Sequence, residues 1–198
     1  MKAILISIKP KDCKLIANGK MTIKVLKSRP KIEAPFKVYI YCTKHKPYLY
    51  RVDDDDNFEL TDTLRPKVDN YVKDYNEQNG KIIGEFVCDR IDEWKYLPDC
   101  FAEDENEKIY YINSADGHAT GLTYDEIENY GKGKDLYGWH ISDLKIYDKP
   151  KELNQFSIPC KVTCENCKNP LYFESLCKEK GKKILTHPPY SWCYISED

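Results

Sequence analysis

The sequence predicts a mainly β fold with short helices, an α+β chain built around a small antiparallel barrel. Short runs with alternating apolar residues, bounded by Gly and Pro, recur along the chain. Helical periodicity is confined to brief stretches, and the strand–helix–strand rhythm of a parallel sheet is missing from the pattern. A chain of 198 residues suffices for one sizeable domain with insertions, or for two small ones.

Each expected element rests on a local signal. Pro10 suits the first turn of a helix, and Asn18-Gly19 stops that helix because Gly adopts a positive φ without a Cβ clash. Alternation in FKVYIYC places Val38 and Ile40 on one strand face and their tyrosine neighbours on the other. In chain order we expect strands at 3–8, 22–28 and 36–43, a helix at 68–79, a strand or hairpin at 81–94, a helix at 124–130 and a strand at 139–147.

The charge is distributed unevenly. Residues 1–51 hold 13 Lys/Arg and 2 Asp/Glu, whereas residues 52–143 hold 9 and 24, and residues 144–198 hold 9 and 7. A basic segment of this kind can contact the phosphates of a nucleic acid. Alternatively, the acidic middle neutralises the basic start in the folded chain, and the sequence leaves both interpretations open.

No stretch approaches the ~20 apolar residues of a membrane helix. The first residues, MKAILISIKPKD, lack the length and cleavage site of a signal peptide. We therefore expect a cytoplasmic protein without a membrane partner.

The opening KAILISIKPKDCKLIANGKMTIKVLKSRPK resembles the start of ASCH-domain proteins of the PUA-like superfamily. The resemblance continues in FKVYIYCT, GKIIGEFVCDRIDEW and YGWHISDLKIYDKPKEL, and HPPYSWCYI is similar to the tail of phage and Firmicute members. It implies a PUA-like β-barrel, with a ligand cleft between the barrel and the helix that follows the first strand.

The family motif is glycine, any residue, lysine, then Thr-x-Glu-x-Arg. Gly19 and Thr22 fit this motif, whereas Met21, Lys24 and Leu26 replace its lysine, glutamate and arginine. Some members hydrolyse the amide of an acetylated cytidine with residues of this cleft, and strand order would make Glu85 the glutamate. Because Met21 neither donates a hydrogen bond nor titrates, the resemblance does not favour an enzyme here, and no catalytic residue is assigned.

A second block, Trp139 to Asp143, borders the ligand cleft in the family. Trp139 would stack on a base, a contact worth roughly 1–3 kcal/mol in single-strand binding, while His140 and Ser142 face the other side of the strand. The alternative is that Trp139 belongs to the core and His140 is a hydrogen-bonded surface residue.

The nine cysteines indicate thiols or a metal rather than disulfides. Cys164 and Cys167 form a CxxC pair typical of zinc knuckles, and thiolates in a loop-rich segment can be organised by Zn²⁺. Cys193 is a more distant candidate for completing the site, and a set of free cysteines is the alternative. The predicted zinc ligands are Cys160, Cys164, Cys167 and Cys177.

We therefore expect residues 1–153 to form the barrel, with acidic insertions at about 44–79 and 97–122, and residues 154–198 to form a cysteine-rich extension that returns to it. The leading function is binding of a nucleic acid, RNA or a modified nucleotide. The alternatives are a small-amide or RNA hydrolase and a phage-encoded protein that inhibits a host nucleic-acid system by binding a protein partner. The predicted ligand contacts are Lys9, Lys20, Thr22, Lys24, Lys27, Arg29, Trp139, His140 and Ser142.

Overall fold

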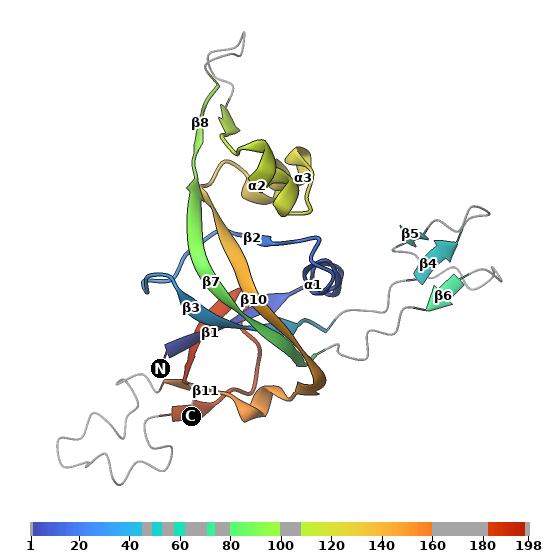
Figure 1. The fold of residues 1–198 in the computed structure, drawn as a ribbon, viewed down its shortest axis with the longest axis vertical. Coiled ribbons are helices and arrows are strands. Elements are labelled where there is room, and N and C mark those ends of the chain that lie inside the picture. Colours follow the sequence, from blue (N-terminus) through green and yellow to red (C-terminus); the bar gives the residue numbers. More distant parts are fainter. Residues whose placement is uncertain are drawn as a thin grey trace.

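The computed structural model describes residues 2–44, 49–52, 58–61, 71–73, 80–99, 108–159 and 182–196. Among these residues it is mainly β with few short helices, as the sequence predicted (Figure 1). The strands are β1 Lys2–Ile8, β2 Ile23–Leu26, β3 Phe36–Cys42, β4 Leu49–Val52, β5 Phe58–Thr61, β6 Tyr71–Lys73, β7 Ile82–Trp94, β8 Tyr96–Pro98, β9 Lys108–Tyr110, β10 Leu136–Lys151, β11 Ser157–Pro159, β12 Lys182–Ile184 and β13 Trp192–Ser196. The helices are α1 Pro10–Ala17, α2 Ser114–Ala119, α3 Tyr124–Gly131 and the 3₁₀ turn η1 Leu153–Gln155. None of the described helices is long and apolar enough to cross a membrane.

An eight-stranded sheet forms the body, in the order β12-β11-β13-β1-β3-β7-β10-β2. β1 and β3 run parallel, and the other neighbours are antiparallel. The hydrogen-bonded ladder among the described residues does not close on itself, so the expected barrel is an open, strongly curved sheet. Near the C-terminus, β13 pairs with β1.

The two central strands are buried on both faces. In β3, Val38, Ile40 and Cys42 belong to one core cluster, while Tyr39 and Tyr41 belong to another across the sheet. This alternation confirms the predicted strand faces, because successive side chains in a strand point to opposite sides. The first cluster is covered by α1, and the second by the segment around η1 and β11.

α1 begins and ends where the local signals predicted. Pro10 occupies its first turn, and at its end the backbone N–H of Asn18 donates to the carbonyl of Lys14 while that of Gly19 donates to the carbonyl of Ile16. Gly19 follows at a φ of 67°, a left-handed conformation that glycine adopts without strain. The chain then turns directly into β2, so the lysine-rich residues 20–31 begin at the end of α1.

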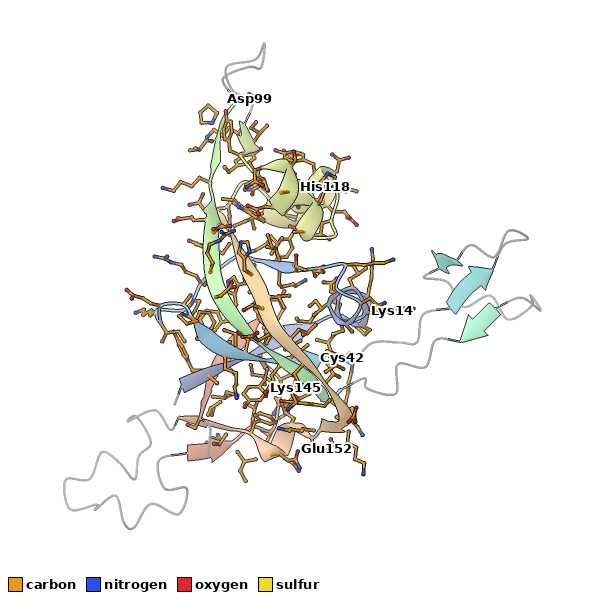
Figure 2. The ribbon with its side chains drawn as sticks, viewed as in Figure 1. Lys14, Cys42, Asp99, His118, Lys145 and Glu152 are labelled. Carbon is orange, nitrogen blue, oxygen red and sulfur yellow. The ribbon has the colours of Figure 1, made fainter. Side chains whose placement is uncertain are left out.

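Residues 95–135 connect β7 to β10 and contain two helices at one end of this strand pair (Figure 1). A third core cluster forms here, in which Ile127 of α3 packs with Ile23 of β2 and Trp94 of β7. Thr123 and Glu126 form a capping box at the start of α3. Figure 2 shows His118 on the neighbouring helix, α2.

Three expectations for the insertions need correction. Residues 97–122 are not irregular throughout, because α2 and the β8–β9 pair lie within them. The helix expected at 68–79 is wrong at Tyr71–Lys73, which is a strand. Residues 44–66 were expected to be a solvated insertion, yet β4 and β5 lie within them and form a three-stranded sheet with β6.

Gly84 lies at a close approach of β7 and β10. A Cβ at this position would lie 2.5 Å from the backbone oxygen of Lys145, where the register between the strands shifts. We expect Gly84→Ala to destabilise the chain by about 1–3 kcal/mol, since the backbone must move to accept the methyl group. Urea unfolding measures this loss.

The matched control is Gly117→Ala in α2, where an added Cβ meets nothing within 4 Å. Alanine favours a helix over glycine by roughly 1 kcal/mol, so this variant should be as stable as the parent or more stable. Equal unfolding midpoints for the parent and Gly84→Ala would contradict the close approach of the two strands.

Candidate functional site

Two of the three departures from the ASCH motif are core residues. Met21 and Leu26 are buried in the cluster between α1 and the sheet. Where the motif would place a lysine and an arginine, this chain therefore has apolar side chains that stabilise packing.

The third departure, Lys24, forms an ion pair with Asp12 of α1. Lys24 Nζ lies 2.5 Å from Asp12 Oδ2, and the two side chains are only 13% and 16% exposed. The predicted phosphate contact by Lys24 is therefore corrected, because its charge already has a partner. A pairing of Lys24 with Glu85, which would favour a hydrolase, is not formed, since Glu85 contacts Tyr147 and Lys37.

Trp139 does not offer a stacking face. Its side chain is 0% exposed and packs edge-on against Phe36 and at a tilt against Trp192, with centroid distances of 5.5 and 5.8 Å. Its indole nitrogen has no hydrogen-bond partner among the described residues. The interpretation of Trp139 as a core residue replaces the stacking role.

The remaining predicted contacts are accessible. Lys9, Lys20, Thr22, Lys27 and Arg29 are exposed, and His140 and Ser142 are half-buried. Ser142 Oγ donates to the carbonyl of Val87 at 3.0 Å, so this hydroxyl supports the β7–β10 pair.

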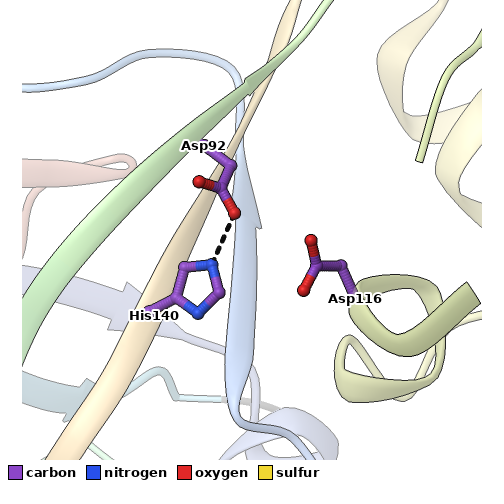
Figure 3. Close-up of side chains that lie close together, drawn as sticks. All are labelled: Asp92, Asp116 and His140. Atoms are coloured by element: carbon purple, nitrogen blue, oxygen red, sulfur yellow. Dashed lines mark hydrogen bonds and ion pairs between the residues drawn. The ribbon is translucent and has the colours of Figure 1, made fainter. Parts of the chain in front are cut away.

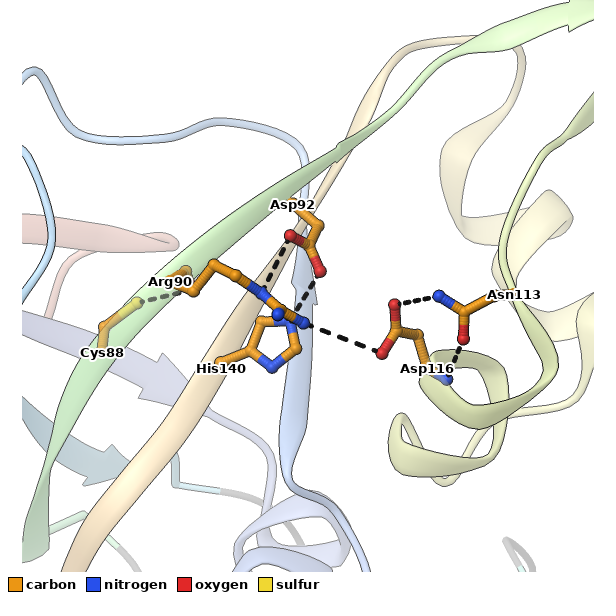
Figure 4. A network of polar contacts seen from close by, with 6 residues as sticks. All are labelled: Cys88, Arg90, Asp92, Asn113, Asp116 and His140. Carbon is orange, nitrogen blue, oxygen red and sulfur yellow. Dashed lines mark hydrogen bonds and ion pairs between the residues drawn. The ribbon is translucent and has the colours of Figure 1, made fainter.

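His140 belongs to a group of side chains that we call the polar cluster: Arg90, Asp92, Asn113, Asp116 and His140 (Figure 4). Arg90 and Asp92 lie two residues apart on β7 and therefore on one face of the strand. His140 lies on the adjacent strand β10, and Asp116 reaches the same point from α2. Three elements thus converge on one surface position.

His140 and Asp92 form a close pair within the polar cluster (Figure 3). His140 Nε2 lies 2.7 Å from Asp92 Oδ2. When Nε2 carries the ring proton it donates to this carboxylate, and the neutral ring then keeps its lone pair on Nδ1. A carboxylate in this place orients the ring, as in sites where histidine acts as a base.

The guanidinium of Arg90 lies between the two carboxylates. Its Nε is 3.1 Å from Asp92 Oδ1, and its Nη2 is 2.9 Å from His140 Nε2 and 4.0 Å from Asp116 Oδ1. Because Nε2 either donates to Asp92 or accepts from Arg90, only one of these hydrogen bonds forms at a time in the neutral ring.

Asn113 fixes the position of Asp116. The Asn113 side chain accepts from the Asp116 backbone N–H at 2.9 Å and donates to Asp116 Oδ2 at 2.6 Å. This is the N-cap of α2, and it aims the other carboxylate oxygen towards Arg90.

Thr22, which matches the family motif, lies close to His140 along the backbone. Its N–H donates to the carbonyl of Ala119 at the end of α2, and its carbonyl accepts from Ile141 of β10. The start of β2 therefore joins α2 to the strand that carries His140.

The sequence analysis missed Arg90, Asp92 and Asp116. Two signals were present: the spacing of Arg90 and Asp92 on one strand face, and an asparagine three residues before an aspartate, which is typical of a helix cap. What the sequence does not contain is the register of β7 on β10.

The predicted zinc ligands Cys160, Cys164, Cys167 and Cys177 lie outside the described residues, so that site stays a prediction. Among the described residues, Cys13, Cys42 and Cys88 are free thiols buried in the core. Burial raises the pKa of Cys88 to about 12 and that of Cys193 to about 11, which keeps both thiols protonated at neutral pH.

Comparison with solved structures shows similarity to ASCH from Zymomonas mobilis. Its crystal structure aligns with a TM-score of 0.51 at 15% identity, over 98% of this chain and 88% of that one. Structures of two point mutants of that protein align with TM-scores of 0.50 and 0.51 at 14% identity, over 100% and 98% of this chain and 92% and 89% of theirs. No protein-family profile and no curated protein matches the sequence. The chain has the fold of these ASCH structures, mainly β with a few short helices, as the resemblance predicted.

Breaking the ion pair of Lys24 and Asp12 by removing one partner should destabilise the chain. We expect Lys24→Met to cost about 3 kcal/mol, because it leaves the carboxylate of Asp12 largely buried without a partner. Chemical denaturation of the full chain measures the loss.

Two controls make this test specific. Lys20→Met removes an exposed lysine from the same segment and should change stability by less than about 0.5 kcal/mol. The double variant Asp12→Leu/Lys24→Met should regain most of the stability, since apolar residues can replace a buried pair. A small effect of Lys24→Met alone would contradict the pairing.

Proposed function

We propose that this chain binds single-stranded RNA through the basic segment, residues 20–31, which contains β2 and the loop after it. The observation that supports this proposal is that the exposed cations of the basic segment make no ion pair with any described residue, although acidic groups lie nearby in the fold. These cations are Lys20, Lys27, Arg29 and Lys31.

The neighbouring carboxylates are already engaged with other partners. Asp12 pairs with Lys24, and Glu126 of α3 lies 3.9 Å from Lys11. Asp92 and Asp116 contact Arg90 in the polar cluster. Among the described residues the acidic middle of the chain therefore does not neutralise the basic segment, which favours phosphate binding over the alternative that the sequence left open.

An aromatic side chain lies beside the basic segment. Lys27 Nζ lies 4.8 Å from the ring centroid of Tyr130, and Tyr130 is 39% exposed. Exposed aromatic rings beside cations are the usual elements of single-strand binding, because bases stack on the ring while the cations contact phosphates. Tyr130 thus takes the stacking role that the sequence analysis assigned to Trp139.

Charge reversal in the basic segment should weaken RNA binding. For Lys27→Glu/Arg29→Glu we expect an affinity loss of more than tenfold for a short single-stranded RNA, measured by fluorescence anisotropy across a salt series. The slope of log K against log salt should fall by about 1.4, since each lost phosphate contact on a single strand contributes about 0.7.

The matched control is Lys145→Glu/Lys149→Glu, which makes the same charge change at exposed positions of β10. This control should retain most of the affinity and the parent slope. Equal losses of RNA affinity in the two double variants would show that binding depends on net charge and not on the basic segment. Absence of RNA binding by the parent at low salt would exclude the proposal.

A second candidate function is hydrolysis of the bound RNA at the polar cluster. The specific observation that favours it is the oriented pair of His140 and Asp92 close to the exposed Thr22. Incubation of end-labelled RNA with the parent and with His140→Gln tests it: cleavage by the parent alone, with similar RNA affinity, supports hydrolysis, and intact RNA in both restricts the protein to binding.

A further inference from the structure

We propose that the polar cluster is a binding site for a divalent transition metal of the Zn²⁺ class, with Asp92, Asp116 and His140 as ligands. Arg90 would be the cation that occupies this position when the metal is absent. This inference does not rest on RNA binding, because it concerns the affinity of the protein for a metal alone.

The three ligand groups have suitable chemistry and spacing. One ligand atom from each lies within 4.8 Å of the other two, and all three residues are half-buried. An imidazole nitrogen with two carboxylate oxygens is a donor set that suits Zn²⁺. Tetrahedral ligands at bonds of about 2.1 Å lie roughly 3.4 Å apart, so side-chain adjustments of about 1 Å bring the three atoms onto one ion.

The scaffold holds these ligands in place. Asp92 and His140 lie on adjacent strands of the main sheet, and Asn113 fixes Asp116 through two hydrogen bonds. Ligands on paired strands, with a hydrogen-bonded carboxylate, are pre-positioned before a metal arrives.

Arg90 marks the place where the structure already puts a positive charge. Its guanidinium contacts the same three groups, Asp92, Asp116 and His140, and one of its nitrogens lies 2.9 Å from His140 Nε2. The Arg90 side chain is 60% exposed and long enough to swing into solvent. A metal ion and this guanidinium therefore compete for one position.

Three protein ligands leave a coordination position open. Catalytic zinc sites with three protein ligands bind water there and lower its pKa to about 7, whereas structural sites use four protein ligands. With three protein ligands, the polar cluster has the number of donors found in catalytic zinc sites.

Competition with Arg90 gives the sharpest test. Zinc affinity of the full chain is measured by isothermal titration with ZnCl₂ for the parent and for Arg90→Gln, Asp116→Asn and His140→Gln. We expect Arg90→Gln to bind Zn²⁺ about five- to tenfold more tightly, because one or two half-exposed ion pairs no longer oppose the metal. Asp116→Asn and His140→Gln should weaken this binding event by about 100-fold, since loss of even an outer hydrogen-bond partner costs about 10–100-fold.

His118→Gln and Asp125→Asn are the matched controls, because both remove exposed groups of α2 and α3 outside the polar cluster. If the cysteines of 160–177 bind Zn²⁺ as predicted, they contribute equally to all variants, so differences between isotherms report the polar cluster. Identical isotherms for the parent, His140→Gln and Arg90→Gln would overturn the proposal.

A second measurement needs no variant. Mn²⁺ prefers oxygen and nitrogen over thiolate ligands, and its paramagnetism broadens nearby NMR signals. We expect selective broadening at Asp92, Asp116 and His140 in the parent chain. Broadening that is uniform over all exposed carboxylates would contradict a site at the polar cluster.

Discussion

The long antiparallel pairing of β7 with β10 is the interaction on which the rest of the structure depends. It places Arg90 and Asp92 beside His140 and holds the insertion with α2 and α3 at its end. β10 also pairs with β2, so the basic segment is positioned by the same strand. Because the register shifts three times along β7 and β10, the residues that meet across them follow from the bulges as well as from sequence spacing.

The charged residues are divided between two roles. Lys24 and Asp12 form a largely buried pair that joins β2 to α1, and Arg90 joins the sheet to α2. The exposed lysines of the basic segment take part in neither connection. At two positions where the family motif has charged residues, this chain has Met21 and Leu26, and both side chains belong to the core. The chemistry that remains accessible therefore lies at the surface, around Thr22, His140 and the basic segment.

Sequence signals correctly predicted those elements that depend mainly on neighbouring residues in the chain. Pro10 and Asn18-Gly19 delimited α1, and strict alternation gave the two faces of β3. The insertions were predicted poorly, because α2 is a short helix that depends on tertiary contact. Asn113 caps it, and Asp116 in its first turn contacts Arg90 of the sheet. Alternation could not show whether Trp139 is exposed, because it separates the two faces of a strand without saying what covers each face. Phe36 and Trp192 pack on the side of Trp139, and the polar cluster lies on the side of His140. Arg90 and Asp92 were missed because tertiary pairing, not sequence distance, brings them to His140.

The most direct test of the account is amide hydrogen exchange of the full chain, with and without a short single-stranded RNA. If the basic segment binds RNA, the largest gain in protection should fall within residues 20–31, with little change across β11 and β13. Unchanged exchange in residues 20–31, together with RNA-dependent protection elsewhere in the chain, would contradict the assignment of the basic segment as the binding surface.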